Sequence, residues 1–243
     1  MPAARAWVAE AAGTALLVWV ILLAVGLALG ADSPVARALP GPGARFLLVG
    51  VLVAPCVALI TISPLGRVSG AHLNPAVTLA FWSAGRVSHR QLAGYLGAQM
   101  SGALLGALAG RVSLPASTAA SVGGAVTHPS VSGVTAIAVE AGMTVLLLGV
   151  IFGCMSRDRL MRWTPLAIVP VLIGVIWLGS AVTGASLNPA RSEGPALVFG
   201  DTRDLWVYLL GPAFAGVAVG LVSRRFTTVL PMPPNSRVVV GKG

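Results

Sequence analysis

Residues 70–76 read Gly-Ala-His-Leu-Asn-Pro-Ala, and residues 184–190 read Gly-Ala-Ser-Leu-Asn-Pro-Ala. An Asn caps free backbone N–H groups at the start of a helix, and a Pro fits the first helical turn. Each copy lies between long apolar segments, so the sequence predicts two short helices that begin at membrane depth. In matching halves of a membrane protein, such helices are expected to direct their positive ends to one shared point.

The composition of the chain is that of a protein that crosses a membrane several times. Of its 243 residues, 56% are hydrophobic and only 9% are charged, whereas a soluble domain carries about 25% charged residues. Apolar segments of spanning length occupy 7–29, 44–63, 91–110, 133–155, 164–183 and 204–223. We interpret the first as a retained helix rather than a signal peptide, because it is long for one and contains Glu10.

Two shorter apolar stretches, 75–84 and 189–198, begin at the Asn-Pro pairs. A helix needs about 20 apolar residues to cross a bilayer, so each of these stretches is expected to be a re-entrant half-helix. The predicted fold class is therefore an all-α membrane protein with six transmembrane helices and two re-entrant half-helices.

A second repeat supports a division of the chain into two halves. The pattern Glu-x-x-x-Thr occurs as Glu10 to Thr14 and again as Glu140 to Thr144. Three spans per half form an odd number, so the second half is expected to be inverted relative to the first. We assign repeat one to about 5–112 and repeat two to about 133–223.

The net charge of +9 follows the distribution expected of a membrane protein. Most basic residues fall in loops on one side, which predicts that this side and both termini are cytoplasmic. The basic residues on the other side are Arg37, Arg45, Arg111, Arg191 and Arg203. The loop placement argues against a nucleic-acid partner. The channel domain is expected to span 1–230, and 231–243 to be a disordered cytoplasmic tail.

The Asn-Pro-Ala copies are the candidate functional residues at the midplane: Asn74, Pro75, Ala76, Asn188, Pro189 and Ala190. Capping occupies the side-chain oxygen of each Asn, so the amide NH₂ groups are expected to stay free and to donate to a passing solute. The positive helix ends would repel cations and hydronium but admit water or a polyol. The alternative is that both Asn residues serve as caps alone.

Two other kinds of charged residue lie at membrane depth. Glu10 and Glu140 are expected to brace the re-entrant loops by accepting backbone N–H groups, because they occupy mirrored positions; the alternative makes them proton or ion sites. Arg191 follows the second Asn-Pro-Ala in a first helical turn, where a cation is disfavoured. We interpret it as a guard of the pore, the alternative being a solvated loop arginine.

The remaining chemistry of the sequence excludes other classes of function. Cys56 and Cys154 lie inside apolar runs, and the three His residues show no metal-ligand spacing. His72 has Ser186 at the equivalent place in the other repeat, so neither is expected to be catalytic. We therefore expect no enzyme activity, no catalytic residue, no metal and no cofactor.

These motifs resemble the aquaporin, or major intrinsic protein, superfamily over about residues 5–223. The resemblance rests on Glu10-x-x-Gly13-Thr14, on residues 69–78, on Glu140-x-x-x-Thr144, on residues 188–192 and on Gly211-Pro212. It implies an aquaporin-like right-handed six-helix bundle with two half-helices, a pore in each subunit and a homotetramer. It also implies a multi-pass protein of the plasma membrane. The abundance of Ala and Gly beside a single Lys points to the inner membrane of a bacterium.

The resemblance also implies a selectivity filter outside the Asn pair. Ungapped offsets from each Asn place Ala54, Ile176, Ala185 and Arg191 there. Strict water channels resemble one another in carrying Phe and His at the first two places, and glycerol facilitators carry aromatic residues and an Asp after the Arg. The combination here is most similar to nodulin-26-like channels for boric acid and arsenite.

The expected function is thus a passive channel for water and for small uncharged solutes such as glycerol, urea, boric acid or arsenous acid. Three alternatives remain open: a strict water channel, an ion-coupled secondary transporter that uses Glu10 and Glu140, and a scaffold with an occluded pore. Glu193 is expected to lie near Arg191 and to be able to pair with it. Pro55, inside the second span, is expected to shift the wall next to Ala54.

Overall fold

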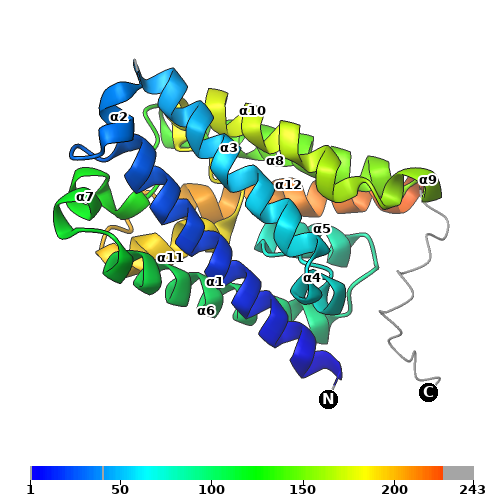
Figure 1. Ribbon diagram of the computed structural model, residues 1–243. Helices are drawn as coiled ribbons and strands as arrows, with labels where there is room; N and C mark the ends of the chain where they lie inside the picture. The colour runs from blue at the N-terminus through cyan, green and yellow to red at the C-terminus, as the bar shows by residue number, and fades with distance from the viewer. Residues whose placement is uncertain (1, 40, 227–243) are drawn as a thin grey trace.

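The computed structural model describes residues 2–39 and 41–226, which form a bundle of helices (Figure 1). The helices are α1 (Pro2–Leu29), α2 (Pro34–Ala38), α3 (Gly41–Ile62), α4 (Pro64–Ser69), α5 (Pro75–Ser83), α6 (His89–Ser113), α7 (Ala116–Ser121), the 3₁₀ turn η1 (Gly123–Ala125), α8 (Gly133–Met155), α9 (Asp158–Met161), α10 (Thr164–Thr183), α11 (Pro189–Phe199) and α12 (Leu205–Phe226). The predicted tail, 231–243, lies outside the described residues.

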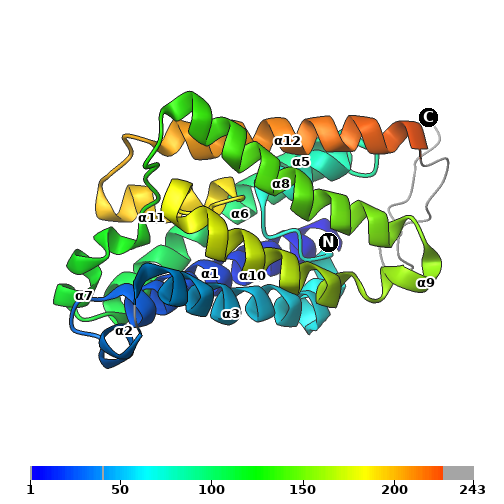
Figure 2. The same cartoon turned by 90° about the horizontal axis from the view of Figure 1, so that it is seen from above.

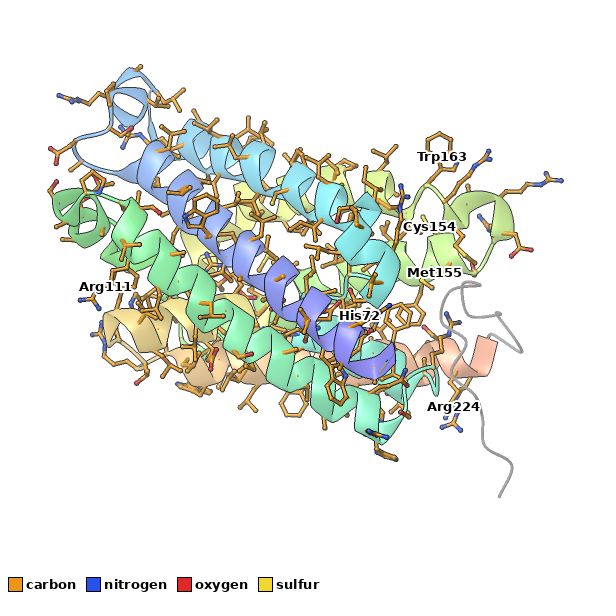
Figure 3. The ribbon with its side chains drawn as sticks, turned by 60° about the horizontal axis from the view of Figure 1, so that its bottom comes forward. His72, Arg111, Cys154, Met155, Trp163 and Arg224 are labelled. Atoms are coloured by element: carbon orange, nitrogen blue, oxygen red, sulfur yellow. The ribbon has the colours of Figure 1, made fainter. Side chains whose placement is uncertain are left out.

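Six of these helices are long and apolar enough to cross a membrane: α1, α3, α6, α8, α10 and α12. They coincide with the six predicted spans to within a few residues at each end, which confirms the predicted fold class. The start of α1, the end of α12 and the short helix α9 lie at one end of the bundle, whereas α2 and α7 lie at the other (Figures 1 and 2). Arg224 and Arg111 mark these two ends in Figure 3.

The two half-helices begin at the Asn-Pro pairs as predicted and pack across the repeats. Helix α5 of repeat one lies along α12 of repeat two, and α11 of repeat two lies along α6 of repeat one (Figure 2). Both contacts need a residue without a side chain, because a Cβ on Gly216 would meet the carbonyl of Ala76 and one on Gly194 would meet that of Ala103. Each repeat thus supplies the wall against which the other repeat's half-helix is held.

Helix α6 also packs closely on α1 through its small residues. A Cβ on Gly102 or Gly106 would collide with the backbone carbonyls of Ala11 and Ala15. Small residues at four-residue spacing let membrane helices approach to backbone contact, where dispersion forces act over many atoms. The glycines of α6 therefore serve the close packing of α6 on α1.

The two repeats differ in how they enter their re-entrant loops. In repeat one, α3 ends at Ile62, and a separate helix α4 starts at Pro64 with Ser63 as its cap. In repeat two, α10 continues unbroken to Thr183. The segments predicted from the sequence, 44–63 and 75–84, did not include a helix at α4. A Ser-Pro pair ends one helix and starts the next because Pro suits a first turn and lacks the N–H of a helix interior.

Candidate functional site

The re-entrant loops meet through the side chains of Asn74 and Asn188. The Asn74 Oδ1 accepts a hydrogen bond from Ala76 N at 2.8 Å, and the Asn188 Oδ1 accepts one from Ala190 N at 3.0 Å. Each amide nitrogen then reaches the opposite loop: Asn74 Nδ2 donates to the Leu187 carbonyl at 2.9 Å, and Asn188 Nδ2 donates to the Leu73 carbonyl at 2.8 Å. The structure therefore brings the two Asn residues together.

These crossed bonds correct one expectation. The sequence analysis predicted that the side-chain NH₂ groups of Asn74 and Asn188 make no hydrogen bond within the protein. In the structure, each NH₂ group donates one of its two hydrogens to a backbone carbonyl of the opposite loop. An amide nitrogen carries two donors, so a single N–H per Asn is left without a protein partner among the described residues. Such a fixed donor is better oriented than a free amide, because the cross-bond restricts rotation of the side chain.

The loop backbones are mirrored as closely as the side chains. Residues three and one before each Asn have positive φ angles: 49° at Ala71 and 53° at Leu73, and 46° at Ala185 and 54° at Leu187. Left-handed backbone at a residue other than glycine is uncommon, and each instance costs of the order of 1–3 kcal/mol. Only surrounding contacts can hold four such residues in place.

Glu10 and Glu140 supply those contacts. The Glu10 carboxylate accepts from His72 N at 2.9 Å and Leu73 N at 2.7 Å. The Glu140 carboxylate accepts from Ser186 N at 3.0 Å and Leu187 N at 2.7 Å. Both side chains are fully buried, so the carboxylates are satisfied by the loops that they hold. The geometry agrees with bracing.

Side chains complete the two braces. Gln99 Nε2 donates to Glu10 at 2.7 Å, and Thr183 Oγ1 donates to Glu140 at 2.7 Å. The two braces are therefore satisfied by different partners, an amide in repeat one and a hydroxyl in repeat two. This asymmetry is the kind of detail that a shared Glu-x-x-x-Thr pattern does not predict.

Tyr95 and Tyr208 form a mirrored pair that the sequence analysis did not predict. Tyr95 Oη donates to the Ser69 carbonyl at 2.5 Å, and Tyr208 Oη donates to the Thr183 carbonyl at 2.7 Å. Ser69 and Thr183 each lie five residues before an Asn. The chain has only two Tyr residues, and both hold the entry to a re-entrant loop. Their scarcity and similar spacing from the two motifs were the signals available in the sequence.

A cavity of about 1250 Å³ runs past the meeting point of the loops. Its wall includes Arg90 at the start of α6, both Asn residues, and Ala125 in η1 near the other end of the bundle. His72 lies in the interior of the bundle (Figure 3), where its ring stacks on Phe81 with centroids 4.7 Å apart. The cavity thus connects the two ends of the bundle by way of the paired helix starts.

Three of the four predicted filter residues, Ile176, Ala185 and Arg191, line this cavity. Ala54 is fully buried and does not line it, whereas its neighbour Val53 does. The ungapped offset from Asn74 counts across the break between α3 and α4, so it does not determine which residue of α3 faces the cavity. Helix α3 itself continues through Pro55.

Arg191 is buried at the second half-helix, with 8% of its surface exposed. Its Nη1 donates to the carbonyl of Ala125 at 3.2 Å. The expected pairing with Glu193 is absent from the ion pairs of the described residues, and the Glu193 Oε2 is buried without a hydrogen-bond partner. Glu193 lies two positions further along α11, so its side chain points to a different face from Arg191.

Charged residues of the connection between α11 and α12 meet His128, which lines the cavity. His128 Nδ1 lies 2.8 Å from Asp204 Oδ2, and Arg203 donates to Asp201 at 2.9 and 2.7 Å. The two hydrogen bonds from the Arg203 guanidinium lower the pKa of Asp201 to about 2.

We expect this low pKa to be measurable. A depressed carboxyl pKa contributes stability that is present above the ordinary value of 3.8 and is lost as the pH falls through about 2. In a ¹³C NMR titration, the Asp201 carboxyl should therefore have a midpoint near 2, and Arg203→Gln should move it toward 3.8. A midpoint near 3.8 in the unaltered protein would contradict the pairing.

Comparison with known proteins agrees with this arrangement. The family profile described as "Major intrinsic protein" matches residues 1–223. The chain is 38% identical to "Aquaporin NIP1-3" of Oryza sativa subsp. japonica over 66% of this chain and 55% of that protein. It is 37% identical to "Probable aquaporin AqpM" of Archaeoglobus fulgidus over 90% of this chain and 95% of that protein. The chain spans little more than half the length of the plant relatives that it matches.

A solved structure shares the fold. The structure described as the aquaglyceroporin from Plasmodium falciparum superposes with a TM-score of 0.72 and covers 92% of this chain and 95% of its own, at 19% identity. This likeness concerns the fold alone. Because the family profile extends over nearly the whole chain, the resemblance seen in the motifs is confirmed: the chain is a multi-pass membrane protein that belongs to the major intrinsic protein family.

Proposed function

We propose that the chain is a passive membrane channel for water and small uncharged solutes, of the class of glycerol, urea, boric acid and arsenous acid. The observation that carries this proposal is the cavity that joins the two ends of the bundle past Asn74 and Asn188. Family membership supports it, and so do the names of the relatives, which are aquaporins. Proteins of this kind are channels rather than enzymes.

The meeting point of the half-helices supplies a reason for ion exclusion. Two helix N-termini carry roughly half a positive charge each, and α5 and α11 both begin beside the cavity. Arg191 adds a full positive charge on the outer side. A cation or hydronium therefore meets a barrier, whereas a neutral molecule can accept hydrogen bonds from the remaining Asn N–H groups. Pro75, Ala76, Pro189 and Ala190 set this geometry by starting the helices.

The filter that we propose is formed by Val53, Ile176, Ala185 and Arg191. Three of its four side chains are apolar, so Arg191 is the charged donor among them that orients a solute. Without an aromatic ring, such a filter is wider than one that fits a single water molecule. The predicted small wall at Ala54 is replaced by Val53, which is also smaller than an aromatic residue.

Purified protein in liposomes tests the proposed function. We expect osmotic water flux well above that of empty liposomes, together with swelling in glycerol, urea and boric acid, and no dissipation of a proton gradient. The flux should be linear in the solute gradient and indifferent to proton or sodium gradients. Water flux without solute entry would favour the strict water channel, and absence of any flux from folded protein would favour the scaffold.

The ion-coupled transporter has less structural support. Both carboxylate oxygens of Glu10 and of Glu140 accept hydrogen bonds from backbone N–H groups of the re-entrant loops. Neither residue lines the cavity. A coupling site needs a carboxylate that can exchange a proton or an ion with the transport path. Solute uptake driven by a proton or sodium gradient would restore this alternative.

The membrane orientation, the location and the oligomeric state of the channel are also part of this proposal. Arg67, Arg86, Arg157 and Arg224 belong to the end of the bundle that carries α9, which supports a cytoplasmic location of both termini. We infer a homotetramer in the plasma membrane, in a bacterium the inner membrane, whose partners are the lipid bilayer, water and small neutral solutes, and no nucleic acid. Within a channel domain of 1–230, the inverted repeats cover about 5–112 and 133–223.

A further inference from the structure

The carbonyl that holds Arg191 is presented by an unusual turn. In η1, the three residues Gly123, Gly124 and Ala125 have φ angles of 53°, 61° and 59°. Two of them are glycines, which adopt left-handed backbone at little cost, but Ala125 does so against its preference. The turn therefore needs external contacts to keep the Ala125 carbonyl 3.2 Å from Arg191 Nη1.

Thr127, two residues after the turn, provides such a contact in the interior. Its hydroxyl oxygen lies 2.8 Å from the hydroxyl of Ser192, the residue that follows Arg191 in α11. Both side chains are buried, with 4% and 1% exposed. Thr127 is among the residues that line the cavity, whereas Ser192 is not, so the hydroxyl contact lies behind the cavity wall and is little exposed to competing water. The turn is thus tied to the helix that bears Arg191, at the neighbouring residue.

The contact belongs to a longer row of hydroxyl groups. Ser192 Oγ lies 2.6 Å from Ser186 Oγ, and Ser186 Oγ lies 2.9 Å from the carbonyl oxygen of Asn188. The row therefore runs from Thr127 to the backbone of the pore Asn. The methyl group of Thr127 also faces Gly184, where an added Cβ would lie 3.0 Å from it. Thr127 contacts both the re-entrant loop and its half-helix.

Other contacts of this segment are peripheral. Gly124 packs on the ring of Phe199, at the far end of α11. His128 meets Asp204 at 2.8 Å, but these side chains are 39% and 34% exposed and compete with water. Neither contact involves a neighbour of Arg191. Thr127 is the side chain of the 123–128 segment whose hydroxyl joins the turn to the filter.

We propose that Thr127 is a positioning residue of the filter, whose hydroxyl, through Ser192, keeps the Ala125 carbonyl in place to orient the Arg191 guanidinium. This inference rests on the proposed channel function and goes beyond it, because Thr127 determines selectivity without being one of the four filter residues. When its hydroxyl is lost, Arg191 is expected to sample orientations that widen the filter.

The test compares two substitutions at position 127. Thr127→Val keeps the shape and the methyl contact with Gly184 but removes the hydroxyl, whereas Thr127→Ser keeps the hydroxyl. In liposomes, Thr127→Val should raise the ratio of glycerol to water permeability about fivefold, the change expected for one lost buried hydrogen bond. Thr127→Ser should keep the unaltered ratio. Thr118→Val, a buried threonine in α7 at the same end of the bundle, is the matched control and should change nothing.

A second measurement does not depend on transport. The ¹⁵N resonances of the Arg191 guanidinium in bilayers should shift in Thr127→Val and return to their position in Thr127→Ser. An unshifted Arg191 signal and an unchanged permeability ratio in Thr127→Val would overturn the positioning role. If the unaltered protein conducts nothing, the channel function fails, and the NMR shift still decides whether Thr127 orients Arg191. Equal effects of the Val and Ser variants would indicate packing alone and also overturn the proposal.

Discussion

Glu140→Gln is expected to reduce water permeability at least tenfold and to lower the melting temperature. The Glu140 carboxylate accepts three hydrogen bonds, from Ser186 N, Leu187 N and Thr183 Oγ1. A Gln retains one acceptor oxygen and turns an NH₂ group toward a backbone N–H. Hydrogen bonds to a charged group contribute about 1.5–3 kcal/mol each, and a buried donor left without an acceptor costs a similar amount.

Loss of the Glu140 hydrogen bonds affects the pore because Leu187 contacts both Glu140 and Asn74. Its carbonyl accepts the hydrogen bond from Asn74, and its own backbone has a φ of 54° that the Glu140 contact stabilises. When the brace is removed, the loop can relax toward ordinary backbone angles and withdraw that carbonyl. Stopped-flow light scattering on liposomes of equal protein content measures the permeability, and thermal unfolding in detergent measures the stability.

Glu193→Gln is the matched control for this substitution. Glu193 lies in the same half of the chain, and its Oε2 has no hydrogen-bond partner among the described residues. The identical chemical change removes no hydrogen bond and relieves a buried, unpaired carboxylate, so it should lower neither the permeability nor the melting temperature. Glu10→Gln, the mirrored brace, should reproduce the defect of Glu140→Gln. Normal permeability in both Glu10→Gln and Glu140→Gln would show that the re-entrant loops keep their conformation without the two carboxylates.

The second large effect is expected from narrowing the filter. In the double variant Val53→Phe with Ile176→His, glycerol permeability should fall at least about tenfold while water permeability persists, since selectivity follows the diameter and the donors of a pore. Val53 and Ile176 both line the cavity, so the new rings would occupy the path. Solute swelling and osmotic shrinkage of the same liposomes give the two permeabilities.

Ala54→Phe with Ile176→His separates the two placements of the filter. Ala54 is fully buried, so a Phe there would overpack the interior at a cost of typically 1–3 kcal/mol. We expect this variant to lose stability without the selective loss of glycerol flux. If it narrows the pore instead and Val53→Phe does not, the offset from Asn74 is right and the assignment of Val53 is wrong.

The sequence was most informative where a local rule determines the structure. Apolar segments of spanning length predict helices because a bilayer leaves no other partner for backbone groups. Asn-Pro predicts a helix start because capping involves only neighbouring residues, and α5 and α11 begin at Pro75 and Pro189 as expected. The bracing expected of Glu10 and Glu140 followed from their mirrored places in the two repeats, and the hydrogen bonds agree with it.

The features that sequence did not predict depend on distant contacts. The left-handed backbone at Leu73 and Leu187 has no local signature, because carboxylates far away in the sequence, Glu10 and Glu140, hold it. The crossed Asn bonds join residues that are 113 and 115 positions apart. Which residue of α3 faces the cavity, Val53 rather than Ala54, depends on how α3 packs against α1 and α10, which counting from Asn74 does not contain.

The crossed bonds also set an order of events during synthesis. Asn74 donates to a carbonyl at Leu187, so the first re-entrant segment stays without its acceptor while the ribosome still holds the second half. Until α11 enters the bilayer, the first loop has an open polar contact that water or a chaperone must satisfy. A chain released before residue 187 therefore carries an unfinished first half, even though every residue of that half has been made.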